Sequence, residues 1–216
     1  MNIILFGAPG AGKGTQASEI VRKYNLTHIS TGEIFRNAIA SNTAIGELAN
    51  SYISKGCLVP DDVTVEIVKE RLAQEDCKNG FILDGFPRTL PQAECLDQIC
   101  LELNISIDHV IDIEVNEDEL IRRLSGRRVC KTCGASYHID FNPSKVENVC
   151  DKCNGELYTR KDDEKESVAV RLKTYKSSTM PLINYYMEKG LLVAINGQQE
   201  INDVLNEIVE KIGEKL

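Results

Sequence analysis

Hydrophobic and polar positions along the chain follow two periods in turn, one typical of strands and the other of helices. Short apolar runs have the length of strands that are covered on both faces, at residues 3–6, 26–29, 81–84, 109–115 and 191–195. Between and after them, apolar residues recur at helical spacing, in residues 16–24, from 34 onward, 43–54, 60–74, 91–103, 116–126, 164–187 (with a kink or split at Pro181) and 201–212. The alternation predicts an α/β fold in which helices flank a parallel sheet.

Two segments do not fit this alternation. Residues 30–59 predict two helices without a strand, opened by the capping-box spacing of Ser30 and Glu33. Residues 126–163 lack helical periodicity. We interpret both segments as insertions in one core, which is formed by residues 1–29, 60–125 and 164–216.

Composition excludes several classes of protein. The 216 residues carry a formal net charge of −8, which disfavours an extended contact with nucleic acid or an anionic membrane. The apolar runs are too short to cross a bilayer, and the first residues lack the pattern of a secretory signal. We therefore expect a cytoplasmic protein. No long apolar stripe is left over after the core is assigned, so we expect a monomer.

The glycine-rich stretch at residues 7–15 reads Gly-Ala-Pro-Gly-Ala-Gly-Lys-Gly-Thr and joins the first strand to the first helix. Glycine allows a tight turn whose N–H groups approach an anion, and the following helix N-terminus adds its own N–H groups. Lys13 supplies a point charge for phosphates. Gly14 stands where the general phosphate-loop pattern has Ser or Thr, and Thr15 follows one place later. A chance glycine-rich turn is the alternative, and the strand-to-helix context favours phosphate binding.

Charged residues follow the strand at residues 81–84. Asp84 ends that strand, at the edge of a parallel sheet where ligands bind, and a carboxylate there suits hydrated Mg²⁺. Arg88 follows four residues later and offers a planar fork for phosphate oxygens. Further arginines bracket the two insertions, although each alone would be interpreted as a surface charge: Arg36, Arg123, Arg127, Arg128, Arg160 and Arg171. We expect no metal or catalytic role for His28, His109 and His138.

Four of the eight cysteines form two CxxC pairs separated by sixteen residues, Cys130 with Cys133 and Cys150 with Cys153. Two such pairs can complete a tetrahedral thiolate site, which predicts a structural zinc ion. Gly134 and Gly155 lie just past the pairs, where tight backbone is expected. Two disulfides or reduced core thiols are alternatives, and iron can also occupy four thiolates. The other cysteines are expected to be small core residues: Cys57, Cys77, Cys95 and Cys100.

Several of these motifs together resemble adenylate kinase over the whole chain. They are residues 7–15, Ser30-Thr31-Gly32, Asp84-Gly85-Phe86-Pro87-Arg88-Thr89 with Gln92, and Gly126-Arg127-Arg128. Residues 126–163 resemble the long lid of that family in its zinc-carrying form. The sequence departs from the family pattern at Cys57, where a lysine can occur, and at Glu33, where aspartate is also seen.

The resemblance implies two nucleotide sites. The ATP site would comprise Gly10, Ala11, Gly12, Lys13, Gly14, Thr15, Arg123, Arg127, Ser136, Tyr137 and Gln199. The AMP site would comprise Thr31, Arg36, Cys57, Leu58, Val59, Gly85, Phe86, Pro87, Arg88, Gln92, Arg160 and Arg171. Within these sets Gln92 would recognise the adenine edge of AMP and Arg123 would stack on the adenine of ATP. Arg127, Arg160 and Arg171 would converge on the phosphoryl group in transfer.

The implied reaction is reversible: ATP and AMP give two ADP, with Mg²⁺ on the triphosphate. The catalytic residues would be Lys13, Asp84, Arg88, Arg127, Arg160 and Arg171. They would act by positioning and by charge stabilisation, without a general base. Three alternatives remain open: a pyrimidine nucleoside monophosphate kinase, a nucleotide-hydrolysing enzyme, and a zinc-ribbon module that binds nucleic acid or protein under a nucleotide switch.

Overall fold

Five parallel strands form the central sheet of the computed structural model, which describes residues 1–213. The strands follow one another across the sheet in the order β2, β3, β1, β4, β8. Their bounds are β1 (Asn2–Phe6), β2 (Thr27–Ser30), β3 (Phe81–Asp84), β4 (His109–Glu114) and β8 (Leu192–Asn196). Each predicted strand is present, displaced by at most one residue at either end. The α/β class with a parallel sheet is confirmed.

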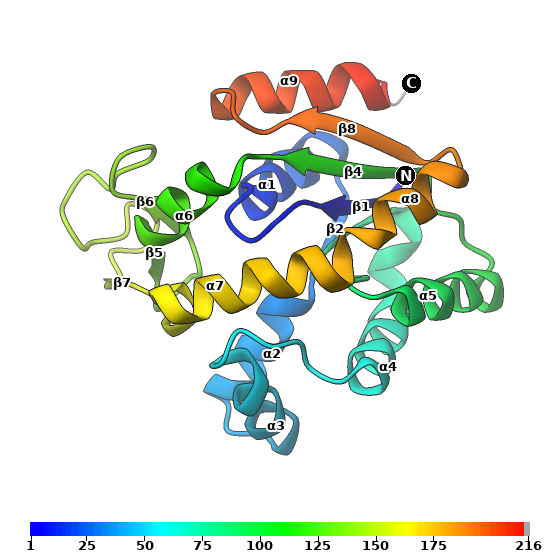
Figure 1. Cartoon of the computed structure of the whole chain (residues 1–216), viewed down its shortest axis with the longest axis horizontal. Helices are drawn as coiled ribbons and strands as arrows, with labels where there is room; N and C mark the ends of the chain where they lie inside the picture. The colour runs from blue at the N-terminus through cyan, green and yellow to red at the C-terminus, as the bar shows by residue number, and fades with distance from the viewer. Residues whose placement is uncertain (214–216) are drawn as a thin grey trace.

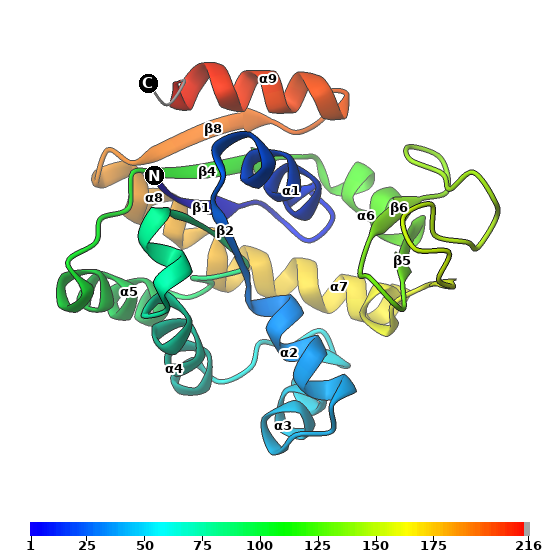
Figure 2. The same ribbon diagram turned by 180° about the vertical axis from the view of Figure 1, so that it is seen from behind.

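Helices connect the strands and cover both faces of the sheet (Figures 1 and 2). The α-helices are α1 (Lys13–Tyr24), α2 (Thr31–Ala40), α3 (Ala44–Ile53), α4 (Asp61–Leu72), α5 (Leu90–Leu103), α6 (Glu117–Ser125), α7 (Lys165–Thr174), α8 (Pro181–Glu188) and α9 (Ile201–Ile212). Side-chain caps begin several of them. The Ser30 hydroxyl accepts from the Glu33 N–H at 3.4 Å, as the capping-box spacing predicts, and the Asn116 side chain accepts from the Glu119 N–H at 2.9 Å.

The core divides into two layers because side chains of a strand point alternately to opposite faces of the sheet. Ile3 and Leu5 of β1 pack in a layer with residues of α1, α7 and α9. Ile4 and Phe6 pack in the other layer with residues of α4, α5 and α8. All four side chains are at least 97% buried. Burial on both faces explains why the strands are continuous apolar runs.

Two groups of elements project from this body on either side of α7 (Figure 1). The first is α2 with α3, whose small core is formed by Phe35, Ala49 and Val59. The second is an antiparallel sheet in the order β6, β5, β7, with bounds β5 (Arg127–Cys130), β6 (Ser136–His138) and β7 (Leu157–Tyr158). We call residues 126–163 the lid. The strands of the lid were not predicted. Each is only two to four residues long, which is too short to leave a periodic signal in the sequence.

The helical stretch that contains Pro181 is split, as its sequence predicts. A π-helical turn, η3 (Tyr175–Thr179), follows α7, and Pro181 is the first residue of α8. Proline fits the first turn of a helix because the N–H that it lacks has no intrahelical partner there. Two short 3-10 helices, η1 (Glu75–Asn79) and η2 (Lys161–Asp163), complete the described elements. None of the helices in residues 1–213 combines the length and apolar character that crossing a bilayer requires.

Candidate nucleotide-binding site and lid metal centre

The glycine-rich loop lies between the carboxyl end of β1 and the first turn of α1. Gly10 and Gly12 have φ angles of +89° and +98°, which favour glycine. At Gly10 a side chain would also meet the Leu120 carbonyl oxygen at 3.0 Å. Gly12 precedes α1 and provides no side-chain cap, so the first N–H groups of the helix are available to a ligand. This is the geometry of an anion site at a helix N-terminus.

Lys13 begins α1 and folds back over the loop. Its Nζ donates to the carbonyl oxygens of Gly7 at 2.7 Å and Ala8 at 3.0 Å. Burial lowers the pKa of Lys13 to about 8, and the nearby guanidinium groups of Arg88 and Arg171 act in the same direction, while Asp84 opposes them. A buried ammonium group surrounded by other cations gains most from an anionic partner. The site is therefore arranged for a multiply charged anion.

Asp84 ends β3 beside the glycine-rich loop. A side chain at Gly14 would come within 3.9 Å of the Asp84 carboxylate, so the carboxylate faces the start of α1. His28 on the neighbouring strand β2 lies beside the same carboxylate oxygen, with Nε2 3.7 Å from Oδ2. Burial opposes ionisation, but His28 and Lys13 keep the pKa of Asp84 below its usual value. Asp84 is thus an ionised carboxylate at the edge of the site, as a ligand of hydrated Mg²⁺ requires.

The turn that follows β3 is hydrogen-bonded to the first residue of α2. The Gly85 carbonyl oxygen accepts from the Thr31 hydroxyl at 2.8 Å and from Arg88 Nε at 2.8 Å. Gly85 has a φ of +83°, and a side chain there would approach Arg88 Nη2 to 2.8 Å and Thr31 Oγ1 to 3.0 Å. Only glycine fits this close approach. The structure therefore brings together three residues of the implied AMP site.

Gln92 is almost fully buried in the first turn of α5. Its Nε2 donates to Asp61 Oδ1 at 2.7 Å, and its Oε1 accepts from the Arg88 N–H at 2.7 Å. Asp61 also accepts from the Thr89 hydroxyl at 2.8 Å. These bonds fix the orientation of the amide, and each end keeps further hydrogen-bonding capacity. Sequence analysis missed Asp61, which it treated only as part of a helix start.

Arginines from separate parts of the chain meet at the boundary between the lid and α7. Arg127 of β5 forms a bidentate pair with Asp163, from Nε to Oδ2 at 2.7 Å and from Nη2 to Oδ1 at 2.5 Å. Arg171 of α7 reaches the same carboxylate at 2.9 Å. The Asp163 side chain is 0% exposed, so its charge is balanced by these two cations.

Asp162 completes this arginine cluster. Its carboxylate lies 3.3 Å from Arg160 Nε and 3.0 Å from Arg171 Nη1. Burial and the charge of Arg160 lower the pKa of Arg36, in the middle of α2, to about 10. Asp162 and Asp163 were not predicted as site residues. The signal was their position, directly after Arg160 and Lys161 in an otherwise structureless segment.

One cavity connects the two halves of the site. It encloses about 70 Å³ and is lined by Lys13 from α1, Gly85 and Arg88 from the β3 turn, and Arg171 from α7. Leu58, from the loop that the resemblance assigns to AMP, lines it as well. Of the neighbouring loop residues, Cys57 is exposed and Val59 is buried among α2 and α3. Cationic side chains from three separate parts of the chain therefore line one cavity: Lys13, Arg88 and Arg171.

The remaining residues of the implied ATP site lie near the lid and the end of β8. Arg123 on α6 donates through Nη1 to the Gly197 carbonyl oxygen at 2.9 Å and pairs with Glu119. Gln199 is held by the Asn196 carbonyl oxygen at 3.1 Å. Ser136 is exposed at the start of β6. The Tyr137 side chain, in contrast, is buried among the lid cysteines, so any contact with a nucleotide would come from its backbone.

The four lid cysteines come together as their spacing predicts. All are free thiols, and their Sγ atoms lie within 4.8 Å of one another. The separations Cys130 to Cys153 and Cys133 to Cys150 are 3.4 and 3.5 Å. Four sulfurs bound at about 2.3 Å around one Zn²⁺ are roughly 3.8 Å apart, so the donor set fits a tetrahedral ion.

The two CxxC pairs have the same backbone geometry. In each, the N–H of the residue after the second cysteine donates to the carbonyl oxygen of the first, at 3.1 Å from Gly134 and 2.9 Å from Asn154. Both residues have a left-handed backbone conformation, with φ of +72° and +59°. The chain is also tightly packed at Gly155, as expected, although Gly155 has no positive φ. Glycine is required there because a side chain would come within 2.9 Å of Cys130 Sγ.

Comparison with known proteins decides the family. The family model described as adenylate kinase matches residues 5–191. The chain belongs to the adenylate kinase family. It is 56% identical to the adenylate kinase of Acetivibrio thermocellus over 98% of both chains. It is 53% identical to that of Alkaliphilus oremlandii over the full length of both, and 56% identical to that of Bacillus cytotoxicus over 99% of both.

Membership of this family makes the chain an enzyme, a phosphotransferase of adenine nucleotides. This excludes the alternative of a nucleotide-switched binding module. The fold agrees, because the cavity lies at the carboxyl ends of parallel strands, where ligands bind in such sheets.

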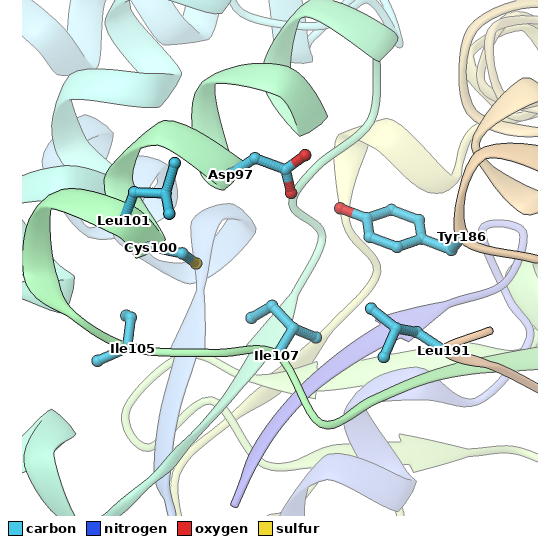
Figure 3. Close-up of a pocket in the computed structure, with 7 residues that line it drawn as sticks. All are labelled: Asp97, Cys100, Leu101, Ile105, Ile107, Tyr186 and Leu191. Carbon is cyan, nitrogen blue, oxygen red and sulfur yellow. The ribbon is translucent and has the colours of Figure 1, made fainter. Parts of the chain in front are cut away.

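A second cavity lies near the amino ends of β4 and β8 (Figure 3). It encloses about 260 Å³ between α5, α8 and the segments that precede β4 and β8. The lining residues are Asp97, Cys100, Leu101, Ile105, Ile107, Tyr186 and Leu191. They include one carboxylate and no lysine or arginine. This cavity thus lacks the positive charge that a nucleotide phosphate needs.

Proposed function

We propose that the enzyme transfers the terminal phosphoryl group of ATP to AMP, giving two ADP, across the cavity between the glycine-rich loop and the β3 turn. The observation that supports this proposal is the convergence of Lys13, Arg88 and Arg171 on that cavity. The ATP phosphates would contact the first N–H groups of α1 and Lys13. The AMP phosphate would contact Arg88 and Arg36, and its base would contact Gln92.

In the proposed reaction, an oxygen of the AMP phosphate attacks the γ-phosphorus of ATP. The new P–O bond forms on one side while the bond to the β,γ-bridging oxygen breaks on the other, and ADP leaves with that oxygen. The AMP phosphate is already an anion, so no side chain has to remove a proton. The enzyme's contribution is positioning and electrostatic stabilisation of the equatorial oxygens, by Lys13 and by Arg88, Arg127, Arg160 and Arg171.

Mg²⁺ bound to the triphosphate neutralises part of its charge. Asp84 is the residue that would hold the hydrated ion, because its ionised carboxylate faces the start of α1. Residues 30–59 and 126–163 are proposed to act as the AMP-binding insertion and the lid on a core of residues 1–29, 60–125 and 164–216. Their closure would exclude water, which otherwise competes with AMP for the phosphoryl group.

We also propose that the lid carries one structural Zn²⁺ on Cys130, Cys133, Cys150 and Cys153. The proposal is supported by four free thiols within bonding distance of a common point and by a lid core of only four buried apolar residues. So small a core needs a metal to stabilise it. The ion leaves no coordination position for substrate, so its contribution is structural. Iron is the alternative that metal analysis distinguishes.

A coupled assay for ADP tests the function. We expect ADP formation to require both ATP and AMP in the presence of Mg²⁺. Faster turnover with CMP or UMP would instead identify a pyrimidine nucleotide kinase, and phosphate release from ATP without AMP would identify a hydrolase. We further propose a cytoplasmic monomer, because the sequence lacks a secretory pattern and a leftover apolar stripe, and no affinity for nucleic acid, because the net charge is −8. Light scattering and a mobility-shift assay test the last two points.

A further inference from the structure

The Tyr137 side chain belongs to the four-cysteine centre rather than to the nucleotide cleft. Tyr137 is the middle residue of β6, and its neighbours point away from the cysteines because side chains alternate along a strand. It is 7% exposed and packs with Cys130, Cys150 and Leu157. A tyrosine buried in a cluster of sulfurs must find a partner for its hydroxyl group.

Two polar groups of the second CxxC pair satisfy that hydroxyl. The Asp151 N–H donates to Tyr137 Oη at 2.8 Å, and Cys150 Sγ lies 3.4 Å from the same oxygen. Because the oxygen accepts from the backbone, its own hydrogen is available to the sulfur. A metal-bound thiolate has no proton and can only accept. With a metal bound, the hydrogen bond would therefore run from Tyr137 to Cys150.

We propose that Tyr137 is an outer-sphere residue of the lid metal centre, whose hydroxyl donates to the metal-bound sulfur of Cys150 and retards loss of the ion. The proposal rests on the proposed metal site. Four thiolates and one divalent cation carry a net charge of −2, and a hydrogen bond to sulfur disperses part of it. Outer-sphere partners of this kind typically change metal affinity by about 10- to 100-fold.

The same contact ties the metal centre to the nucleotide side of the lid. Tyr137 pairs with Arg128 across β5 and β6, directly beside the register position of Arg127. Through its hydroxyl, this strand is linked to Cys150 and Asp151, which lie at the start of the second CxxC pair. Tyr137 is thus a positioning residue that holds the second pair against the strand that follows the first.

Two tyrosine-to-phenylalanine variants separate the hydroxyl group from the ring. Tyr137→Phe keeps the buried ring and removes only the donor. Tyr158→Phe is the matched control, because Tyr158 lies in β7 of the same small sheet and its hydroxyl has no hydrogen bond within residues 1–213. Both variants lose the same atom from the lid, and only one of them loses a contact with a cysteine.

The readouts concern the metal, not the activity. We expect zinc transfer from Tyr137→Phe to an excess of a chelating dye to be about 10- to 100-fold faster than from the wild type, with Tyr158→Phe unchanged. After replacement of the ion by Co²⁺, the sulfur-to-cobalt charge-transfer band should shift in Tyr137→Phe alone. Equal release rates and equal spectra in all three proteins would overturn the inference.

The outcomes distinguish this inference from the metal proposal itself. If the reduced wild type binds no Zn²⁺ or Co²⁺, both proposals fail. If the wild type binds the ion and Tyr137→Phe is indistinguishable from it, only the inference fails. Should Tyr137→Phe not fold, site-specific 3-fluorotyrosine at position 137 keeps the hydroxyl but changes its donor strength, and the cobalt band must still move.

Discussion

Arg127 and Asp163 form a bidentate ion pair that links the first strand of the lid to the short helix before α7. The carboxylate is fully buried and is shared with Arg171. The arginines proposed to bind the transferring phosphoryl group are thus held by an acidic side chain. Each guanidinium group keeps further N–H donors, so it can bind a phosphate while the buried Asp163 stays paired.

Replacement of Arg127 by alanine tests its catalytic role. We expect kcat to fall by about 100- to 1,000-fold, because a charge that stabilises the transition state is lost. The fold should survive, since Arg171 still balances the buried Asp163. Arg22→Ala is the control: Arg22 is 79% exposed and pairs only with Glu19 in the described structure. Steady-state kinetics with circular dichroism compare the two. Normal turnover by folded Arg127→Ala would remove Arg127 from the mechanism.

Gln92 should determine affinity for AMP. Gln92→Ala removes the side chain proposed to recognise the adenine edge, so kcat/KM for AMP should decrease by about 10- to 100-fold. The KM for ATP should stay close to the wild-type value. Gln98→Ala, on an exposed position of the same helix, provides the control. An equal loss for AMP and ATP would indicate that Gln92 acts only through its bonds to Asp61 and Arg88.

Productive binding of ATP should weaken at alkaline pH, because Lys13 loses its charge there. Burial lowers its pKa to about 8, so the free enzyme loses the ammonium charge above that pH. We expect kcat/KM for ATP to decline above pH 8. The limit for kcat should lie at higher pH, because bound phosphates stabilise the charged form. Initial rates between pH 6 and 10 test this. Identical limits for kcat and kcat/KM would show that Lys13 is not the titrating group.

Asp112 should reduce stability at neutral pH. It lies in the middle of β4, is 2% exposed, and its Oδ1 atom has no hydrogen-bond partner in residues 1–213. Burial, with a contribution from Glu114, raises its pKa to about 6. A carboxyl group with a raised folded-state pKa favours folding at acid pH, and that advantage is lost as pH rises from about 4 through 6.

Asp112→Asn removes this titration, so the variant should be more stable than the wild type at pH 7.5. The gain should be at most about 3 kcal/mol and should disappear near pH 4. Urea unfolding at both values measures it. Ile111→Val is the control. Ile111 is the adjacent residue of β4 and faces the other core layer, so its replacement should lower the free energy of unfolding equally at both pH values. A pH-independent effect of Asp112→Asn would contradict the interpretation.

Removal of metal should affect the lid before the core. We expect about one Zn²⁺ per chain in reduced protein, and chelation should increase proteolysis within residues 126–163 while the melting of the core changes little. Cys153→Ser should reproduce the effect, whereas Cys95→Ser, at an exposed position of α5, should not. Reduced protein without bound metal would refute the site.

The sequence predicted the features that depend on local pattern. Strand β3, helix α9 and the cap at Ser30 depend on periodicity or on a side-chain bond within one turn, so each was visible. The glycine-rich loop and the CxxC pairs were visible for the same reason, because their chemistry needs fixed spacings. The resemblance then supplied the roles of separate arginines that no spacing connects.

The structure was needed for partners that are distant in sequence. Asp61 holds Gln92 across 31 positions, and Asp163 holds Arg127 across 36. Acidic residues are common in this chain, so nothing marked these two before the fold brought them to a cation or an amide. Tyr137 was named from the sequence, as a residue of the implied ATP site. The direction of its side chain could not be predicted, because it depends on the pairing of β6 with β5.

Helix α7 makes contact with both insertions at once. Ser167 reaches the Ser54 carbonyl oxygen at 3.4 Å, and Arg171 reaches Asp162 and Asp163 of the lid. Beyond its far end, Thr179 donates to the Arg88 carbonyl oxygen at 3.0 Å. A displacement of either insertion relative to the core must therefore change its contact with α7.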